Sequence, residues 1–171
     1  MPASENRPPA SDSPQPQGVI ACTWSPDPEA LGDRELRWIL SRWHSARVRA
    51  PVPAETWIEP GQFRAATSDV MLFDRTPDGH DARIRLIGSR LAELIGHELT
   101  GALLSERPRE IWIGHQLRWL VGECARRRQP CLAEIVGPSP QGAVLLTALL
   151  LPVANPDRKV ARLAAIIRLG L

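Results

Sequence analysis

The stretch that decides the fold is Asp69–Gly96, DVMLFDRTPDGHDARIRLIGSRLAELIG. Its first part, residues 69–76, is rich in apolar side chains and predicts a β-strand. Residues 77–79, Pro-Asp-Gly, are typical of a tight turn. The partner strand is predicted over residues 80–87, and residues 89–95 predict a short helix that stops at the following glycine. The stretch therefore predicts a β-hairpin that leads directly into a helix.

The second strand of this hairpin is predicted to have one buried and one exposed face. Ile84 and Leu86 alternate with Arg83 and Arg85, and successive side chains of a strand point to opposite faces. We therefore predict that Leu86 points into the core and Arg85 away from it.

An amphipathic helix is predicted before the hairpin. Asp33 is a suitable N-cap, and the helix should run from there to about Val48. Its apolar side chains recur at helical spacing and form one stripe: Leu36, Ile39, Leu40 and Trp43. The prolines that follow predict an extended crossing: Pro51, Pro53 and Pro60. Ahead of the helix, residues 1–17 predict a disordered leader because they are rich in Pro, Ser and Gln, whereas Val19–Trp24 predicts a short extended segment.

A long helix and three strands are predicted after the hairpin. The helix should extend from Arg109 to about Gln129, with a buried stripe formed by Ile113, Leu117, Leu120, Val121 and Cys124. The strands are predicted over Cys131–Val136, Ala143–Leu151 and Val160–Leu169. The middle strand is almost entirely apolar, which is typical of a central strand covered on both faces.

Composition limits the class of protein. The chain has 171 residues, of which 43% are hydrophobic, and a formal net charge of +2. This charge is too small to favour a nucleic acid or a membrane surface as partner. The three cysteines are scattered in the sequence, without metal-ligand spacing, as expected in a reducing cytoplasm. Because the sequence shows neither a signal peptide nor an apolar run of about 20 residues, we expect a soluble, cytoplasmic protein.

The order of predicted elements resembles that of a PAS domain. The motifs that carry the resemblance are Arg83-Ile84-Arg85-Leu86-Ile87-Gly88-Ser89, Leu91, Leu94-Ile95-Gly96, Leu99-Thr100-Gly101, the helix residues Leu36, Leu40, Trp43 and Arg47, and Glu59-Pro60. Over residues 33–169 the chain is similar to a bacterial, alphaproteobacterial-type family of single-domain PAS proteins. The resemblance implies an α+β fold: a five-stranded antiparallel sheet with short helices and one long helix on one face, preceded by the amphipathic N-terminal helix. Residues 18–171 would then form one domain.

The resemblance also implies a sensory or protein-interaction module in cytoplasmic signalling or in transcriptional or cell-cycle regulation. We expect a cavity for a small apolar ligand between the sheet and the long helix, lined by Ile84, Leu86, Leu91, Ile95, Leu117, Val121, Ile135 and Leu163. The other sheet face should be covered by the first helix of the same chain, by a second copy in a homodimer, or by a partner protein. The candidate interface residues are Leu36, Leu40, Trp43, Arg83, Arg85, Arg162 and Arg168.

Catalytic and cofactor motifs are not found in the sequence. It has no nucleophile elbow, phosphate-binding loop or zinc-protease motif, so we predict no enzymatic activity. Flavin-binding light sensors of the PAS type carry an Asn-Cys-Arg-Phe-type motif, whereas Cys124 lies in Gly-Glu-Cys-Ala-Arg. Haem-binding PAS domains use a histidine on the long helix, but His115 is predicted to point about 160° away from the buried stripe.

We therefore expect neither flavin nor haem, and the dispersed histidines argue against a metal site. Two alternatives stay open. One is a small isomerase or hydrolase that uses the same cavity, and the other is a DNA-binding regulator that acts through the Arg-rich first helix.

Overall fold

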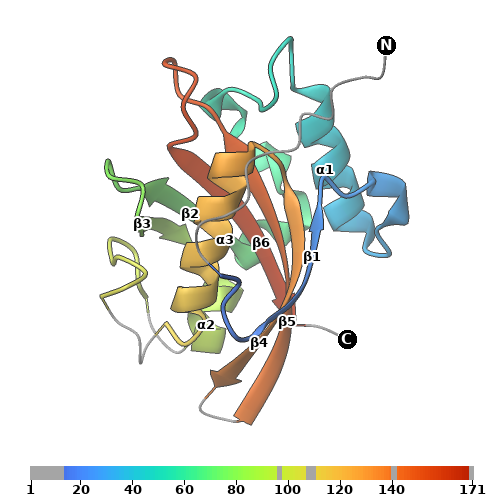
Figure 1. The fold of residues 1–171 in the computed structure, drawn as a ribbon. Helices are drawn as coiled ribbons and strands as arrows, with labels where there is room; N and C mark the ends of the chain where they lie inside the picture. Colours follow the sequence, from blue (N-terminus) through green and yellow to red (C-terminus); the bar gives the residue numbers. More distant parts are fainter. Residues whose placement is uncertain (1–13, 96–97, 107–110, 140–141, 170–171) are drawn as a thin grey trace.

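One antiparallel sheet organises the chain (Figure 1). The computed structural model describes residues 14–95, 98–106, 111–139 and 142–169. In these residues the strand order is β1-β4-β5-β6-β2-β3, with the bounds β1 Val19–Trp24, β2 Val70–Arg75, β3 Ala82–Ile87, β4 Cys131–Ser139, β5 Gly142–Val153 and β6 Arg162–Leu169. The five predicted strands are confirmed. The segment predicted only as extended, β1, pairs with β4 and adds a sixth strand at the edge of the sheet.

Helices cover both faces of the sheet. The long helix α3, Gly114–Arg127, crosses one face, which we call the inner face, and α1, Arg34–Ser45, lies over the opposite, outer face (Figure 1). The short helix α2, Ser89–Ile95, follows the β2–β3 hairpin at the predicted residues. Short 3-10 turns occupy the connections: η1 Pro28–Ala30, η2 Glu55–Trp57, η3 Pro60–Gln62 and η4 Arg64–Asp69.

The first helix is fixed to the outer face by its apolar stripe. Asp33 caps it, because Oδ1 of Asp33 accepts hydrogen bonds from the N–H groups of Glu35 and Leu36 at 2.8 and 3.1 Å. The four stripe residues are all buried: Leu36, Ile39, Leu40 and Trp43. Trp43 is fully buried, and its indole N–H donates to the carbonyl of Pro152 in β5 at 2.9 Å. The outer face is therefore covered by a helix of the same chain.

The prediction that Leu86 points into the core is wrong. Phe73 pairs with Ile84, but the next residue towards the N-terminus, Leu72, pairs with Leu86, so β3 carries one extra residue, Arg85, at this point. Such a β-bulge reverses the alternation of side chains beyond it. Leu86 consequently lies on the outer face with 43% of its surface exposed, while Ile84 and Ile87 are buried.

A glycine turns the chain from β3 into α2. A Cβ atom on Gly88 would lie 2.4 Å from the carbonyl oxygen of Ser68 in η4, which is a severe backbone clash. The N–H of Gly88 donates to the carbonyl of Val70 at 2.7 Å. The glycine of the predicted hairpin–helix stretch is therefore required because another backbone segment approaches it closely.

The long helix is shorter than predicted. It begins at Gly114 instead of Arg109, and residues 107–110 lie outside the described residues. It ends where Arg128 adopts a left-handed conformation with φ of 54° and donates its N–H to Cys124. The predicted disordered leader lies mostly outside the described residues, and at its end the side chain of Gln116 in α3 donates to the carbonyl of Gln17 at 3.0 Å.

Candidate functional site

An open groove of about 890 Å³ lies on the outer face of the sheet. One wall is the start of α1 and the turn before it, the other is α2, and the floor is formed by β4, β5 and β6. Seven of the fifteen lining residues are leucine or isoleucine: Leu31, Leu36, Leu91, Leu94, Leu132, Ile167 and Leu169. Leu169 is 57% exposed and Leu94 and Leu132 are half-buried, so the groove offers apolar surface to a molecule from outside.

Four charged side chains form a linked network in this groove. Arg168 of β6 donates from Nη1 to Asp33 and from Nε to Asp69 at 3.2 Å. Arg90 of α2 donates to both carboxylate oxygens of Asp69 at 2.9 Å. Arg168 thus connects the N-cap of α1 to the end of η4, and through Asp69 to α2.

The network is arranged around one buried carboxylate. The side chain of Asp69 is only 2% exposed, whereas those of Arg168 and Arg90 are 23% and 66% exposed. A buried carboxylate is costly unless it is paired and hydrogen-bonded, and two guanidinium groups satisfy Asp69. Asp69 therefore links α2 to β6 through its ion pairs with Arg90 and Arg168.

The pKa shifts of Asp33 and Arg168 favour the charged form of each group. Burial alone would raise the pKa of Asp33, but the hydrogen bonds from Leu36 and Arg168 outweigh it and hold the pKa below its usual range. Burial would lower the pKa of Arg168, but Asp33 and Asp69 raise it. Groups held in their charged forms are poor proton donors and acceptors near neutral pH, so this arrangement is suited to binding and positioning.

Comparison with known proteins assigns the fold to a family. A family model described as a PAS domain matches residues 33–168. The chain belongs to the PAS domain family. It has no match among curated proteins.

Solved structures of PAS and light-oxygen-voltage (LOV) domains are similar to this chain at low sequence identity. A fungal LOV-domain photoreceptor is 18% identical, with 77% of this chain and 89% of that chain covered and a TM-score of 0.45. The PAS domain of a protein from Colwellia psychrerythraea is 13% identical, with 66% and 98% covered and a TM-score of 0.44. A LOV domain studied with a flavin analogue is 12% identical, with 63% and 81% covered and a TM-score of 0.45.

The groove of this PAS domain is not where we expected the ligand cavity. Of the eight predicted lining residues, Leu91 lines the groove, and Leu86 is exposed because of the β3 bulge. The other six are buried in the core: Ile84, Ile95, Leu117, Val121, Ile135 and Leu163. The groove lies on the side of the sheet that faces α1, whereas the predicted cavity lies between the sheet and α3.

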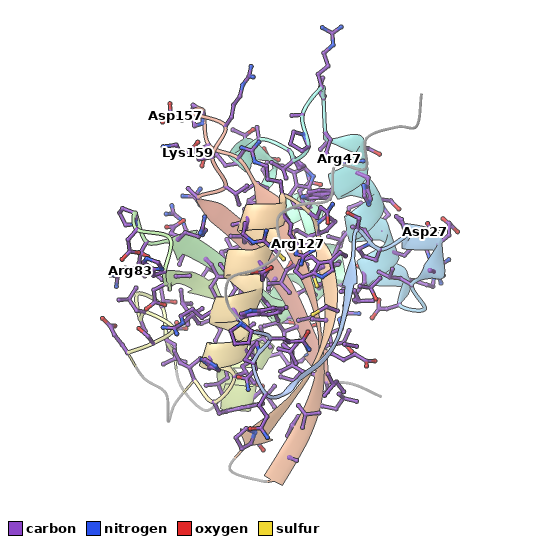
Figure 2. All side chains as sticks on the ribbon, viewed as in Figure 1. Asp27, Arg47, Arg83, Arg127, Asp157 and Lys159 are labelled. Atoms are coloured by element: carbon purple, nitrogen blue, oxygen red, sulfur yellow. The ribbon has the colours of Figure 1, made fainter. Side chains whose placement is uncertain are left out.

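The predicted interface arginines have partners on the same face of the PAS sheet. Asp74 of β2 accepts from Arg162 at 2.8 Å and from Arg85 at 3.0 Å, and Arg83 is exposed and donates to the carbonyl of Gly101 at 2.5 Å (Figure 2). Sequence reasoning missed both acceptors, Asp69 and Asp74. The predicted hairpin places Arg85 near Asp74, but Arg162 and Arg168 reach Asp74 and Asp69 through the pairing of β2 with β6, which was not predicted.

The haem and flavin candidates considered in the sequence, His115 and Cys124, lie on α3. His115 is exposed on α3, and Cys124 is buried. Within the part of the chain that the structure describes, no group of three or more His, Cys, Asp or Glu side chains is placed to hold a metal ion. Among those same residues, no helix has the length and apolar character needed to cross a bilayer.

Proposed function

We propose that this PAS domain is a bacterial, cytoplasmic sensory module that acts by docking to a partner protein or to a second copy, and that a small apolar ligand in the outer-face groove controls this docking. Membership of the PAS family supports a sensory class of function. The observation that carries the proposal is that a single groove is walled by both α1 and α2.

The groove has the properties of a ligand site. Its volume of about 890 Å³ falls within the range of about 300–1,000 Å³ that is usual for small-molecule pockets. Its aliphatic lining favours an apolar molecule, and the exposed guanidinium of Arg90 lies at its edge as a hydrogen-bond donor. The combination supports an apolar ligand with a small polar group.

The same groove supports a mechanism for signalling. Leu31 and Leu36 belong to the α1 wall, and Leu91 and Leu94 belong to α2. A ligand that contacts both walls stabilises the arrangement in which α1 lies on the sheet, and it shifts the population towards that arrangement by its difference in affinity. The partner would bind the exposed surface of α1, so its affinity would depend on whether α1 lies on the sheet.

The test uses the fluorescent probe ANS, an apolar ring system that carries one sulfonate, and two matched leucine variants. Leu94→Glu places a negative charge in the groove, whereas Leu86→Glu places the same charge on an exposed leucine that does not line it. We expect saturable ANS binding by the wild type and by Leu86→Glu, and at least a tenfold weaker affinity for Leu94→Glu. Native mass spectrometry of the protein as purified would show a retained ligand as added mass.

Hydrogen exchange tests the signalling part of the proposal. ANS should slow amide exchange in residues 34–45 of the wild type and not in Leu94→Glu. Equal ANS affinity of the two variants would contradict the groove as the ligand site. Binding without any change of exchange in α1 would contradict the coupling of the ligand to this helix.

A further inference from the structure

The fold gathers all three cysteines of the chain into one cluster. Cys22 is on β1, Cys131 is on β4 and Cys124 is on α3, so residues separated by more than a hundred positions come together. Cys131 lies between Cys22 and Cys124, close enough to each for the side chains to affect its pKa. The cysteines are scattered in the sequence and come together because β1 pairs with β4, which was not predicted.

The cluster has an accessible end and a buried end. Cys22 is partly exposed, whereas Cys131 and Cys124 are fully buried. Cys22 pairs with Ala133 and Trp24 pairs with Cys131, so the two cysteines are diagonal neighbours on adjacent antiparallel strands. An oxidant from solvent therefore reaches Cys22 first, and the sulfur next to it is that of Cys131.

The surroundings hold the reduced thiols in place. The hydrogen bond that Cys22 donates to Cys131, together with burial, raises the pKa of the Cys22 thiol, and the bond from Cys131 to Cys124 raises the pKa of Cys131. Arg127 of α3 lies over the ring of Trp24 beside the cluster, 4.3 Å from the ring centroid (Figure 2). Since the thiolate is the reactive form, the reduced cluster should react with sustained oxidant and resist brief exposure.

We propose that Cys22 and Cys131 are a modification site at which a peroxide forms a disulfide within the chain. The thiolate of Cys22 attacks one peroxide oxygen, the O–O bond breaks, and Cys22 becomes a sulfenic acid while the other oxygen leaves as water. The thiolate of Cys131 then attacks the sulfur of Cys22, the S–O bond breaks and a second water leaves with the proton of Cys131. Two thiols and one hydrogen peroxide thus give one disulfide and two waters. This site goes beyond the proposed function and does not depend on it.

The disulfide would change the position of the edge strand. Diagonal neighbours lie about 7–8 Å apart between Cα atoms, whereas a disulfide needs about 4.4–6.8 Å. Closing the bond therefore moves β1 by roughly 1–2 Å towards Cys131. β1 is the element that moves because it pairs on one side only, with β4. Its end is linked to the start of α1 by residues 25–33, so the movement is passed on towards the groove.

The test treats the reduced protein with hydrogen peroxide and counts free thiols with Ellman's reagent under denaturing conditions. We expect the wild type to lose two of its three thiols and the mass of two hydrogen atoms, with a peptide that links residue 22 to residue 131. Cys124→Ala should lose both remaining thiols. Cys22→Ser, which alters only the partly exposed cysteine, should keep both of its thiols.

Three outcomes would overturn the proposal. These are an unchanged thiol count at a peroxide dose that fully oxidises free glutathione, a disulfide found only between two copies, and equal thiol loss in Cys22→Ser. Circular dichroism of each variant before oxidation establishes that it is folded. If Cys22→Ser does not fold, the test is the peptide that links residue 22 to residue 131. Its presence in the oxidised wild type and in oxidised Cys124→Ala supports the proposal, and its absence from both contradicts it.

Discussion

Replacing Trp43 by alanine removes the anchor of α1 on the outer face. The side chain is fully buried and donates its indole N–H to the carbonyl of Pro152. Its ring also meets that of His44 edge-on, with 5.2 Å between the centroids. The contact joins residues 109 positions apart in the sequence, so its loss weakens the attachment of the helix to the sheet.

The expected loss is large for a single substitution. Truncation of a buried Trp to Ala costs about 3–5 kcal/mol, and the lost hydrogen bond places Trp43→Ala in the upper half of that range. At this chain length the loss lowers Tm by about 8–20 °C. Trp43→Phe keeps most of the ring but not the N–H, so it should cost about 1–3 kcal/mol.

Urea denaturation and thermal melts of three variants provide the measurement. The control is Trp38→Ala, since Trp38 is partly exposed and contacts Arg64 and Arg42, 3.6 and 5.6 Å from its ring centroid. This control should lose about 1 kcal/mol. Equal losses for Trp38→Ala and Trp43→Ala would refute the reasoning. A Trp43→Ala protein with half the light-scattering mass and an unchanged midpoint would show that α1 covers the sheet of a second copy.

Four further substitutions test the fold and the charged network. Ile84→Ala should cost about 2–5 kcal/mol in urea denaturation, whereas Leu86→Ala should cost less than about 1 kcal/mol, and the reverse order would disprove the bulge in β3. Gly88→Ala should cost about 1–3 kcal/mol because its Cβ would lie 2.4 Å from a backbone oxygen; an unchanged midpoint would contradict this contact. Asp33→Asn keeps an N-cap but loses the ion pair with Arg168, so it should cost less than about 1 kcal/mol at pH 7. Because the folded pKa of Asp33 lies below its unfolded value, this difference should shrink as the pH falls through the folded pKa; a difference that does not shrink with falling pH would exclude the ion pair as its cause.

The helices α1 and α2 were predictable from the sequence because each one buries a single face. The apolar spacing of Leu36, Ile39, Leu40 and Trp43 predicted α1, and Asp33 predicted where it starts. The short helix at residues 89–95 was predicted at its observed bounds. These predictions depend on neighbours in the chain, and such information is contained in a single sequence.

The features that depend on strand pairing were not predictable. One extra residue opposite Leu72 and Phe73 reversed the direction of Leu86, and nothing in the alternation of residues 83–86 indicates it. The cysteine cluster and the groove both require contacts between distant segments: β1 with β4, and α1 with α2 across the sheet. A pattern within one segment contains no information about such contacts.

The two ends of α1 are attached to the sheet in different ways, and under the proposed function this difference decides which end a ligand affects. Near the C-terminal end, Trp43 is fully buried and hydrogen-bonded, so release of this end requires the large loss worked out above. At the N-terminal end, Asp33 and Arg168 are 34% and 23% exposed, and partly exposed pairs contribute at most about 1 kcal/mol. The groove lies at this weaker end. Under the proposed function, a ligand that bridges α1 and α2 adds to this weaker attachment. Modest binding energy is then enough to fix the start of the helix, while Trp43 holds the rest in place with or without the ligand.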